Sequence, residues 1–220
     1  MHIEKFVHSC LRLTVGADAL LFDPGKFGFI DGRVDPKTLA GANVVVITHA
    51  HPDHLDPAAL KTILAGGGQV VGNAEVRDKL AGEGLAVEVF DEGVRRFGAF
   101  ELRAIPVPHE PILSKDTPRV TAFLVNGRVL NCGDSFDDAL LPHAGVEALA
   151  LPVMAPYLTE LKVMAFAKAM RPKFALPLHD GHARDFFVEQ RYDTYKPFFR
   201  EAGIEFVRLA KPGDAFDLAE

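Results

Sequence analysis

The sequence has no tryptophan and only two cysteines among its 220 residues. Cys10 and Cys132 lie far apart in the chain, so a disulfide framework is excluded and we expect two buried thiols. No apolar run approaches the roughly 20 residues that span a bilayer. The first residues lack the basic and apolar stretches of a signal peptide. We therefore expect no membrane span and a cytoplasmic location.

Positive charge is also scarce. The chain has 24 lysines and arginines against 30 aspartates and glutamates, which gives a formal net charge of −6. This balance does not favour a nucleic-acid partner, because such proteins usually carry a basic surface. The hydrophobic content of 48% suits a folded core. We expect residues 1–220 to form a single domain.

The first half of the chain alternates between strand and helix patterns. The β-branched run at 43–47 is typical of a strand that is buried on both faces. Asp56 and Pro57 together predict the start of a helix, and Asn73 predicts a second one. The expected strands are 6–8, 10–15, 19–22, 43–47 and 70–71, with helices from 57 to about 65 and from 74 to about 81. A glycine-rich loop is expected over 25–35.

The second half begins with an antiparallel pattern and then alternates again. Asn126-Gly127 between two apolar runs is a strong signal for a two-residue hairpin. The expected strands are 100–105, 128–132, 146–151, 174–178 and 205–209, with helices over 159–170 and 194–202. Pro197 is expected in the first turn of the last helix. The pattern as a whole predicts an α/β (α+β) protein in which helices pack on mixed β-sheets.

The sequence His49-Ala50-His51-Pro52-Asp53-His54 directly follows the buried strand at 43–47. Four side chains of the metal-ligand type therefore share one short loop that the sheet holds rigid. Imidazole suits zinc, iron or nickel, and a carboxylate adds charge and can accept a proton. The alternative is a solvated loop or a helix cap. Asp56 already fills the capping position, so we favour a metal site.

Three more residues of this kind follow later strands, namely His109, Asp134 and His179. Each one alone is more often a capping or surface residue than a ligand. Each of them, however, stands just past the end of a strand, as the first motif does. In series behind that motif they become candidate ligands of the same site.

The order of these motifs resembles the metallo-β-lactamase superfamily. His-x-His-x-Asp-His is followed by a histidine, by Gly133-Asp134-Ser135 and by a late histidine. The openings Val7-His8-Ser9-Cys10 and Leu21-Phe22-Asp23-Pro24 resemble the metal-dependent hydrolase branch near ascorbate-6-phosphate lactonase and N-acyl-phosphatidylethanolamine phospholipase D-like enzymes. The resemblance covers nearly the whole chain. It implies a four-layered αββα sandwich with metals at one edge of the sheets.

The resemblance also implies a ligand set and a reaction. Position by position, the first metal would take His49, His51 and His109, the second would take Asp53, His54 and His179, and Asp134 would bridge them. Two divalent ions, zinc first and manganese, iron or nickel as alternatives, would activate a shared water. The expected bond is an ester, a lactone or a phosphodiester in a small-molecule substrate. Asp53 is also the candidate catalytic residue, because it could orient the nucleophile or move a proton.

Residues near these motifs have weaker signals. Asp23 is equally well explained as a partner of a ligating imidazole or as a turn residue. His8 and His182 are better explained as a core and a surface histidine, although both could face the site. Lys115 and Arg119 could bind an anionic substrate group, though a solvated loop is favoured. Three aromatic side chains could line the pocket or simply pack: Phe27, Phe29 and Tyr157. The pairs 186–187 and 198–199 suit the core or a homo-oligomer contact.

Two other functions fit the same motifs. One is an iron-dependent redox enzyme of the same fold, similar to persulfide dioxygenases. The other is a non-catalytic metal-binding protein. The complete ligand set argues against the second, since seven ligands shared by two ions leave coordination positions open for water.

Overall fold

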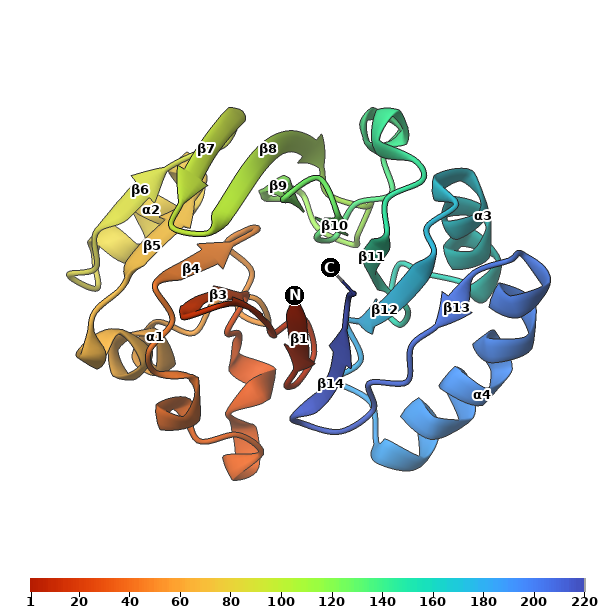
Figure 1. The fold of residues 1–220 in the computed structure, drawn as a ribbon. Coiled ribbons are helices and arrows are strands. Elements are labelled where there is room, and N and C mark those ends of the chain that lie inside the picture. The colour runs from red at the N-terminus through yellow and green to blue at the C-terminus, as the bar shows by residue number, and fades with distance from the viewer. Residues whose placement is uncertain (220) are drawn as a thin grey trace.

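The computed structural model describes residues 1–219, and in this range the strands form two seven-stranded sheets (Figure 1). The first sheet has the order β14 (Asp214–Asp217), β1 (His2–Lys5), β2 (Leu11–Val15), β3 (Asp18–Phe22), β4 (Val44–Ile47), β5 (Gln69–Gly72) and β6 (Val87–Val89). The second has the order β13 (Glu205–Phe206), β12 (Phe174–Leu178), β11 (Ala148–Pro152), β10 (Val129–Asn131), β9 (Arg119–Val125), β8 (Phe100–Pro108) and β7 (Gly93–Phe97).

Both sheets are mixed. Strands β14, β1, β2 and β3 pair antiparallel, and β3 to β6 pair parallel. In the second sheet β7 to β10 are antiparallel and β10 to β13 are parallel. The parallel parts coincide with the segments in which strand and helix patterns alternate, because parallel neighbours need a crossover connection. In each sheet the parallel part brings the carboxyl ends of neighbouring strands to one edge.

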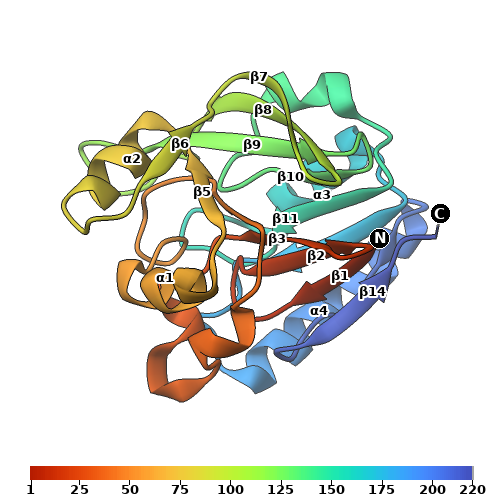
Figure 2. The ribbon, with the colours of Figure 1, turned by 60° about the vertical axis from the view of Figure 1, so that its left-hand side comes forward.

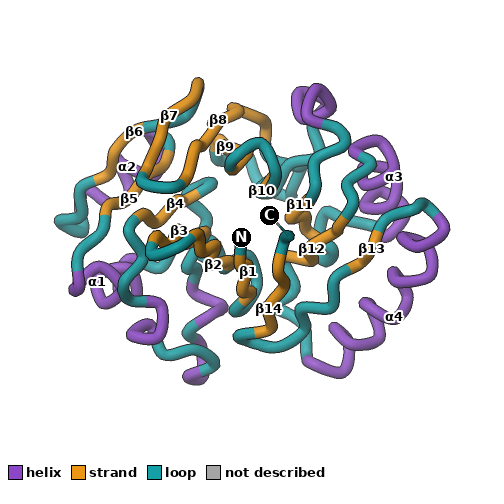
Figure 3. Tube along the Cα trace, viewed as in Figure 1, coloured by secondary structure: helices purple, strands orange, loops and turns teal. Residues whose placement is uncertain are grey.

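Four α-helices cover the outer faces of the sheets. They are α1 (Pro57–Ile63), α2 (Ala74–Ala81), α3 (Glu160–Met170) and α4 (Asp185–Glu201). Figures 1 and 3 show α1 and α2 outside the first sheet and α3 and α4 outside the second, and Figure 2 brings α1 and α2 forward. The Asp56 carboxylate caps α1 and Asn73 caps α2, as expected. Over residues 1–219, none of the helices is long and apolar enough to cross a membrane.

Three hydrophobic clusters separate the layers. Leu13, Phe22 and Phe123 belong to the cluster between the two sheets. Leu60 belongs to the cluster under α1 and α2, and Tyr192 to the cluster under α3 and α4. One apolar interface joins the two sheets, and each of the other two joins a sheet to its pair of helices. The result is a four-layered sandwich. The expected αββα architecture is therefore confirmed.

The strand expected over residues 6–8 is wrong. Strand β1 ends at Lys5, and residues 6–9 form a turn in which His8 has a φ of 64°. The amide of Phe6 donates to the carbonyl of Cys10 and the amide of Cys10 donates to that of Val7, which closes the turn. Phe6 and Val7 are buried like strand residues, so the hydrophobic pattern hid the turn.

The last helix begins much earlier than the sequence pattern predicted. We expected residues 194–202, and α4 spans Asp185–Glu201 with Pro197 inside it. The buried face of α4 consists of Val188, Tyr192, Tyr195 and Phe199, which recur every three or four residues. Packing of this face against the second sheet outweighs the one backbone hydrogen bond that proline cannot donate. The strand expected over 205–209 is shortened to Glu205–Phe206.

Candidate metal centre

Asp23, which directly follows β3, holds the start of the loop after β4 through two hydrogen bonds. The backbone amide of Thr48 donates to Oδ1 of Asp23 at 2.8 Å, and the Thr48 hydroxyl donates to Oδ2 at 2.7 Å. His49 and His54 on this loop are buried, and His51 and Asp53 are partly buried. The loop therefore presents its four ligand-type side chains from a rigid base.

The three later candidates arrive from the second sheet. His109 follows the last residue of β8, Asp134 lies three residues past β10, and His179 follows β12 with a φ of 66°. All three side chains are buried. The structure thus brings all seven predicted ligands to one place between the strand ends of the two sheets.

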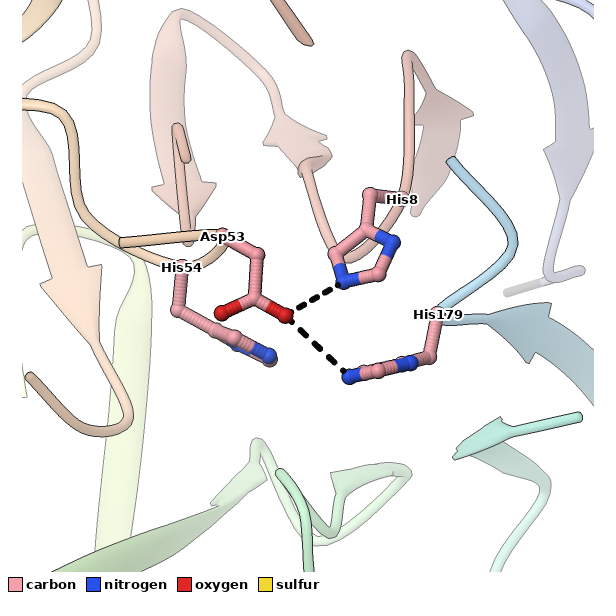
Figure 4. A group of neighbouring side chains, drawn as sticks. All are labelled: His8, Asp53, His54 and His179. Atoms are coloured by element: carbon pink, nitrogen blue, oxygen red, sulfur yellow. Dashed lines mark hydrogen bonds and ion pairs between the residues drawn. The ribbon is translucent and has the colours of Figure 1, made fainter. Parts of the chain in front are cut away.

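The side chains form two groups, each able to hold a metal ion. One group is His49, His51, His109 and Asp134, and the other is His8, Asp53, His54 and His179. Within each group the ligand atoms lie within 4.8 Å of one another. Figure 4 shows the second group, in which the three imidazoles surround the Asp53 carboxylate. Apart from His8, and from Asp134, which falls in the first group, this division is the one that the resemblance implied.

Asp134 stands between the two groups. Its Oδ2 atom lies 3.5 Å from Nε2 of His109, and 3.1 Å from Nε2 of His179 in the other group. Its Oδ1 atom lies 3.3 Å from Nε2 of His54. A carboxylate in this position can contact an ion in either group, so the bridging role stays a prediction with a suitable geometry.

Unpartnered polar atoms show that a metal suits these residues. Among the described residues, four of the buried side-chain atoms without a hydrogen-bond partner belong to the predicted ligands: Nε2 of His54, His109 and His179, and Oδ1 of Asp134. Leaving such an atom unpaired costs about 1–3 kcal/mol each. Imidazole nitrogen together with carboxylate oxygen is a common donor set for divalent ions. The donor set therefore fits a metal centre.

A ring of acceptors orients the imidazoles. Nδ1 of His54 donates to Oδ2 of Asp23 at 2.9 Å, Nδ1 of His109 donates to the Glu110 carbonyl at 2.6 Å, and Nδ1 of His179 donates to the Met154 carbonyl at 2.7 Å. Each bond places the ring hydrogen on Nδ1 and leaves the Nε2 lone pair facing the centre. Of the two explanations for Asp23, the structure supports the partner of an imidazole.

His8 differs from the other histidines. Its Nδ1 atom accepts a hydrogen bond from the Gly181 amide at 3.0 Å, so its ring hydrogen lies on Nε2, which is 3.1 Å from Oδ2 of Asp53. His8 therefore donates to Asp53 instead of offering a lone pair. The sequence favoured a hydrogen-bonded core histidine, and His8 is one, but it also belongs to the site. Its position depends on the turn after β1, which the pattern of residues did not reveal.

The charges in the site follow from burial and from the neighbouring imidazoles. Without metal, His54 and His179 are protonated; burial raises the pKa of Asp134, but their charges outweigh it and hold that pKa well below its ordinary value. Burial opposes ionisation of Asp53 too, but without metal the protonated His179, whose Nε2 lies 3.4 Å away, and the Nε2–H of His8 lower its pKa more strongly. Burial and the charge of His179 lower the pKa of His8 to about 3. Both carboxylates are thus ionised at neutral pH and His8 is neutral.

Aromatic residues line part of the centre. The ring of Phe27 meets that of His8 edge-on at 5.1 Å, and the ring of Tyr157 lies 5.5 Å from that of His109. The ring of His182 lies 5.9 Å from that of His179, on an exposed loop. Phe29 packs instead against the cluster under α1. Of the three aromatic candidates, Phe27 and Tyr157 are at the site.

Several residues that the sequence singled out lie elsewhere. Arg119 is exposed and pairs with Glu75 at 3.8 Å, and Lys115 is exposed. The solvated explanation that we favoured for both is the one that the structure supports. Cys10 and Cys132 are buried and free, as expected. Phe186 and Phe198 are largely exposed, whereas Phe199 is in the core.

Gly25, in the loop after β3, packs directly against the backbone of Asp53 and His54 in the loop after β4. A Cβ atom at residue 25 would lie 1.7 Å from the backbone oxygen of Asp53. Gly25→Ala is therefore expected to displace Asp53 and His54 and to lower metal affinity by about 10–100-fold, the range for loss of groups that orient ligands. Metal titration of the purified variant measures this. Gly28→Ala is the matched control, because a Cβ there meets nothing within 4 Å. Equal metal affinity in both variants would contradict the argument.

The fold and the site define a class of protein: an αββα sandwich with two histidine–carboxylate groups, each able to hold a metal ion, at its strand ends. A sequence model of the beta-lactamase superfamily domain matches residues 2–179. Protein Rv0786c of Mycobacterium tuberculosis is 30% identical over 191 residues, covering 82% of this chain and 84% of that protein. A UPF0173 metal-dependent hydrolase of Methylobacterium nodulans is 28% identical over 204 residues, covering 82% and 85%.

A solved structure shares the fold. The Parabacteroides distasonis protein described as a candidate metal-dependent hydrolase superposes with a TM-score of 0.76 at 22% identity, covering 93% of this chain and 90% of that one. This similarity, at 22% identity, shows the shared fold, and the family model over residues 2–179 shows the membership. The chain belongs to the metallo-β-lactamase superfamily.

Proposed function

We propose that this protein is a hydrolase that uses two divalent metal ions to activate water. The observation that carries the proposal is the set of buried, unpartnered imidazole and carboxylate atoms around Asp134. One ion would be held by His49, His51 and His109, the other by Asp53, His54 and His179, with Asp134 shared. When bound, two such ions lower the pKa of a shared water toward neutrality and stabilise charge on the attacked oxygen.

The chain's own residues then position the reactants. The ionised Asp53 carboxylate, held by the Nε2–H of His8, can accept a hydrogen bond from the attacking water or take up its proton. The Nδ1 bonds of His54, His109 and His179 keep the ligands from turning away. The proposed substrates are small molecules with an ester, lactone or phosphodiester bond. The resemblance to a lactonase and to phospholipase D-like enzymes supports lactones and phosphodiesters alike.

One observation favours hydrolysis and another favours zinc. The relative from Methylobacterium nodulans carries the name of a metal-dependent hydrolase. Five of the seven predicted ligands are imidazoles, which suit zinc in a site with open positions. Iron would also suit them, and an iron-dependent oxidation is the competing reaction. Metal analysis after aerobic purification separates the two: bound iron with oxygen uptake on a persulfide would overturn the hydrolase proposal.

His51→Ala is expected to abolish metal-dependent turnover while the fold is kept. The side chain is partly exposed and its Nδ1 lies 3.2 Å from Nε2 of His49, so its loss opens one ligand position without a large cavity. The measurement is hydrolysis of a panel of lactones, esters and phosphodiesters by the metal-loaded protein, each with a chelator control. His143→Ala is the matched control, since His143 is also partly exposed and lies outside both groups. Full activity of metal-free His51→Ala protein would disprove the proposal.

A further inference from the structure

Tyr157 is the one tyrosine that stands at the metal centre. It lies on the loop between β11 and α3, and its ring meets those of His109 and His179 edge-on at 5.5 and 5.8 Å. These two histidines belong to different metal groups, and both approach Oδ2 of Asp134. The phenol is therefore next to the place where the two groups meet.

The hydroxyl of Tyr157 is buried and, among the described residues, forms no hydrogen bond of normal distance and angle; Asp134 is the acceptor that faces it. The other two tyrosines of the chain are satisfied. Tyr195 donates to the Val153 carbonyl at 2.9 Å, and Tyr192 bonds to Asp180. Buried tyrosine hydroxyls usually find a partner, because an unpaired one is unfavourable.

Bound ions would take up the unpartnered atoms of the histidines and the oxygens of Asp134. The Tyr157 hydroxyl would then be free to donate to another acceptor. Phenols are protonated at neutral pH, and burial together with the charge of Asp134 raises the pKa of Tyr157 above the ordinary value, so what it offers is a donor. A donor that is fixed beside the reacting group, and that needs no rearrangement, stabilises the charge that develops there.

We propose that Tyr157 is a further catalytic residue whose hydroxyl donates a hydrogen bond to the substrate oxygen that gains negative charge during attack. The proposal rests on the proposed hydrolysis. The proton stays on Tyr157, so no bond to the tyrosine forms or breaks. Once ions hold Asp134, bound substrate supplies the acceptor for the hydroxyl.

Tyr157→Phe tests this with little disturbance, because the ring contacts with His109 and His179 are kept. The variant is expected to lose about 10²-fold in kcat, the loss seen when one such donor is removed, with KM changed by less than about twofold. The probes are 4-nitrophenyl acetate and bis(4-nitrophenyl) phosphate. Tyr195→Phe is the matched control, as it also removes a buried tyrosine hydroxyl, but one that bonds Val153 in the core. An unchanged kcat in Tyr157→Phe overturns the proposal.

A second readout does not depend on turnover. Wild-type and Tyr157→Phe proteins are loaded with cobalt and titrated with inorganic phosphate while the visible absorption is followed. Both are expected to hold the same number of cobalt ions, and the variant to bind phosphate about tenfold more weakly, since it lacks a hydrogen bond to a charged oxygen. Loss of cobalt in the variant would make Tyr157 a ligand and overturn the proposal, as would equal phosphate affinity.

The two readouts also separate this proposal from the hydrolase proposal. If the wild type hydrolyses none of the panel, the function is wrong, and the phosphate titration alone decides whether Tyr157 is a donor to bound anions. If the wild type binds no cobalt, both proposals fail.

Discussion

Asp134→Asn is expected to reduce metal-dependent turnover on the order of 10³-fold, which corresponds to a loss of several kcal/mol of transition-state stabilisation. Asp134 is the residue that contacts both groups: its oxygens lie 3.1–3.5 Å from Nε2 of His54, His109 and His179. The side chain is 1% exposed, so water cannot replace the lost charge. Asparagine keeps the shape and removes the anion.

The measurement combines metal stoichiometry with kcat/KM on the panel that the wild type hydrolyses. We expect the variant to hold fewer than two ions, because neutral asparagine bridges poorly between cations. Asp137→Asn is the matched control on the same loop. Asp137 caps a short helix by accepting from the Ala139 amide, and asparagine is an equally good cap. An Asp134→Asn protein with two ions and wild-type turnover would contradict the bridging role.

Much of the site could be predicted because its residues stand beside strong patterns. The β-branched run that became β4 predicts a buried strand, and His49–His54 directly follow it. Asp56 caps α1, so capping does not explain the histidines and the aspartate of residues 49–54, and metal binding does. His109 and His179 follow strands in the same way. Local pattern and site therefore coincide at these positions.

The rest depends on contacts between distant segments. His8 reaches Asp53 only because residues 6–9 turn, and its tautomer is set by the amide of Gly181, far along the chain. The donor role of Tyr157 depends on the absence of a partner within the described residues, which no sequence pattern reports. The length of α4 was missed because packing on the second sheet outweighed a proline. Tertiary contacts decided each of these cases.

Removing the metal is expected to destabilise the folded protein by about 2.7 kcal/mol for each ion that is held at 100 times its Kd. For a chain of this size the melting temperature should fall on the order of 5–10 °C per ion. The cause is specific: the buried Nε2 atoms of His54, His109 and His179 and Oδ1 of Asp134 lose their partner together. Thermal melts with and without a chelator measure the effect, and equal melting temperatures would contradict it.

The stability of the metal-free protein should fall as the pH rises. Without metal, the negative charge of Asp134 outweighs the opposing burial and raises the pKa of His179 from 6.5 to about 9, and that of His54 well above 6.5. A group whose pKa is raised on folding adds stability below its unfolded pKa, and that stability is lost as pH rises through the folded value. The metal-free protein should therefore weaken from pH 6.5 to 9.

In the metal-loaded protein the same imidazoles are already deprotonated, so that decline should be absent. The gain in melting temperature on adding metal should accordingly grow from pH 6.5 to 9. His143→Ala should show the same trend as the wild type, because residue 143 lies outside both groups. A gain that is flat or shrinks over this range would mean that His54 and His179 are not the groups that exchange protons for metal.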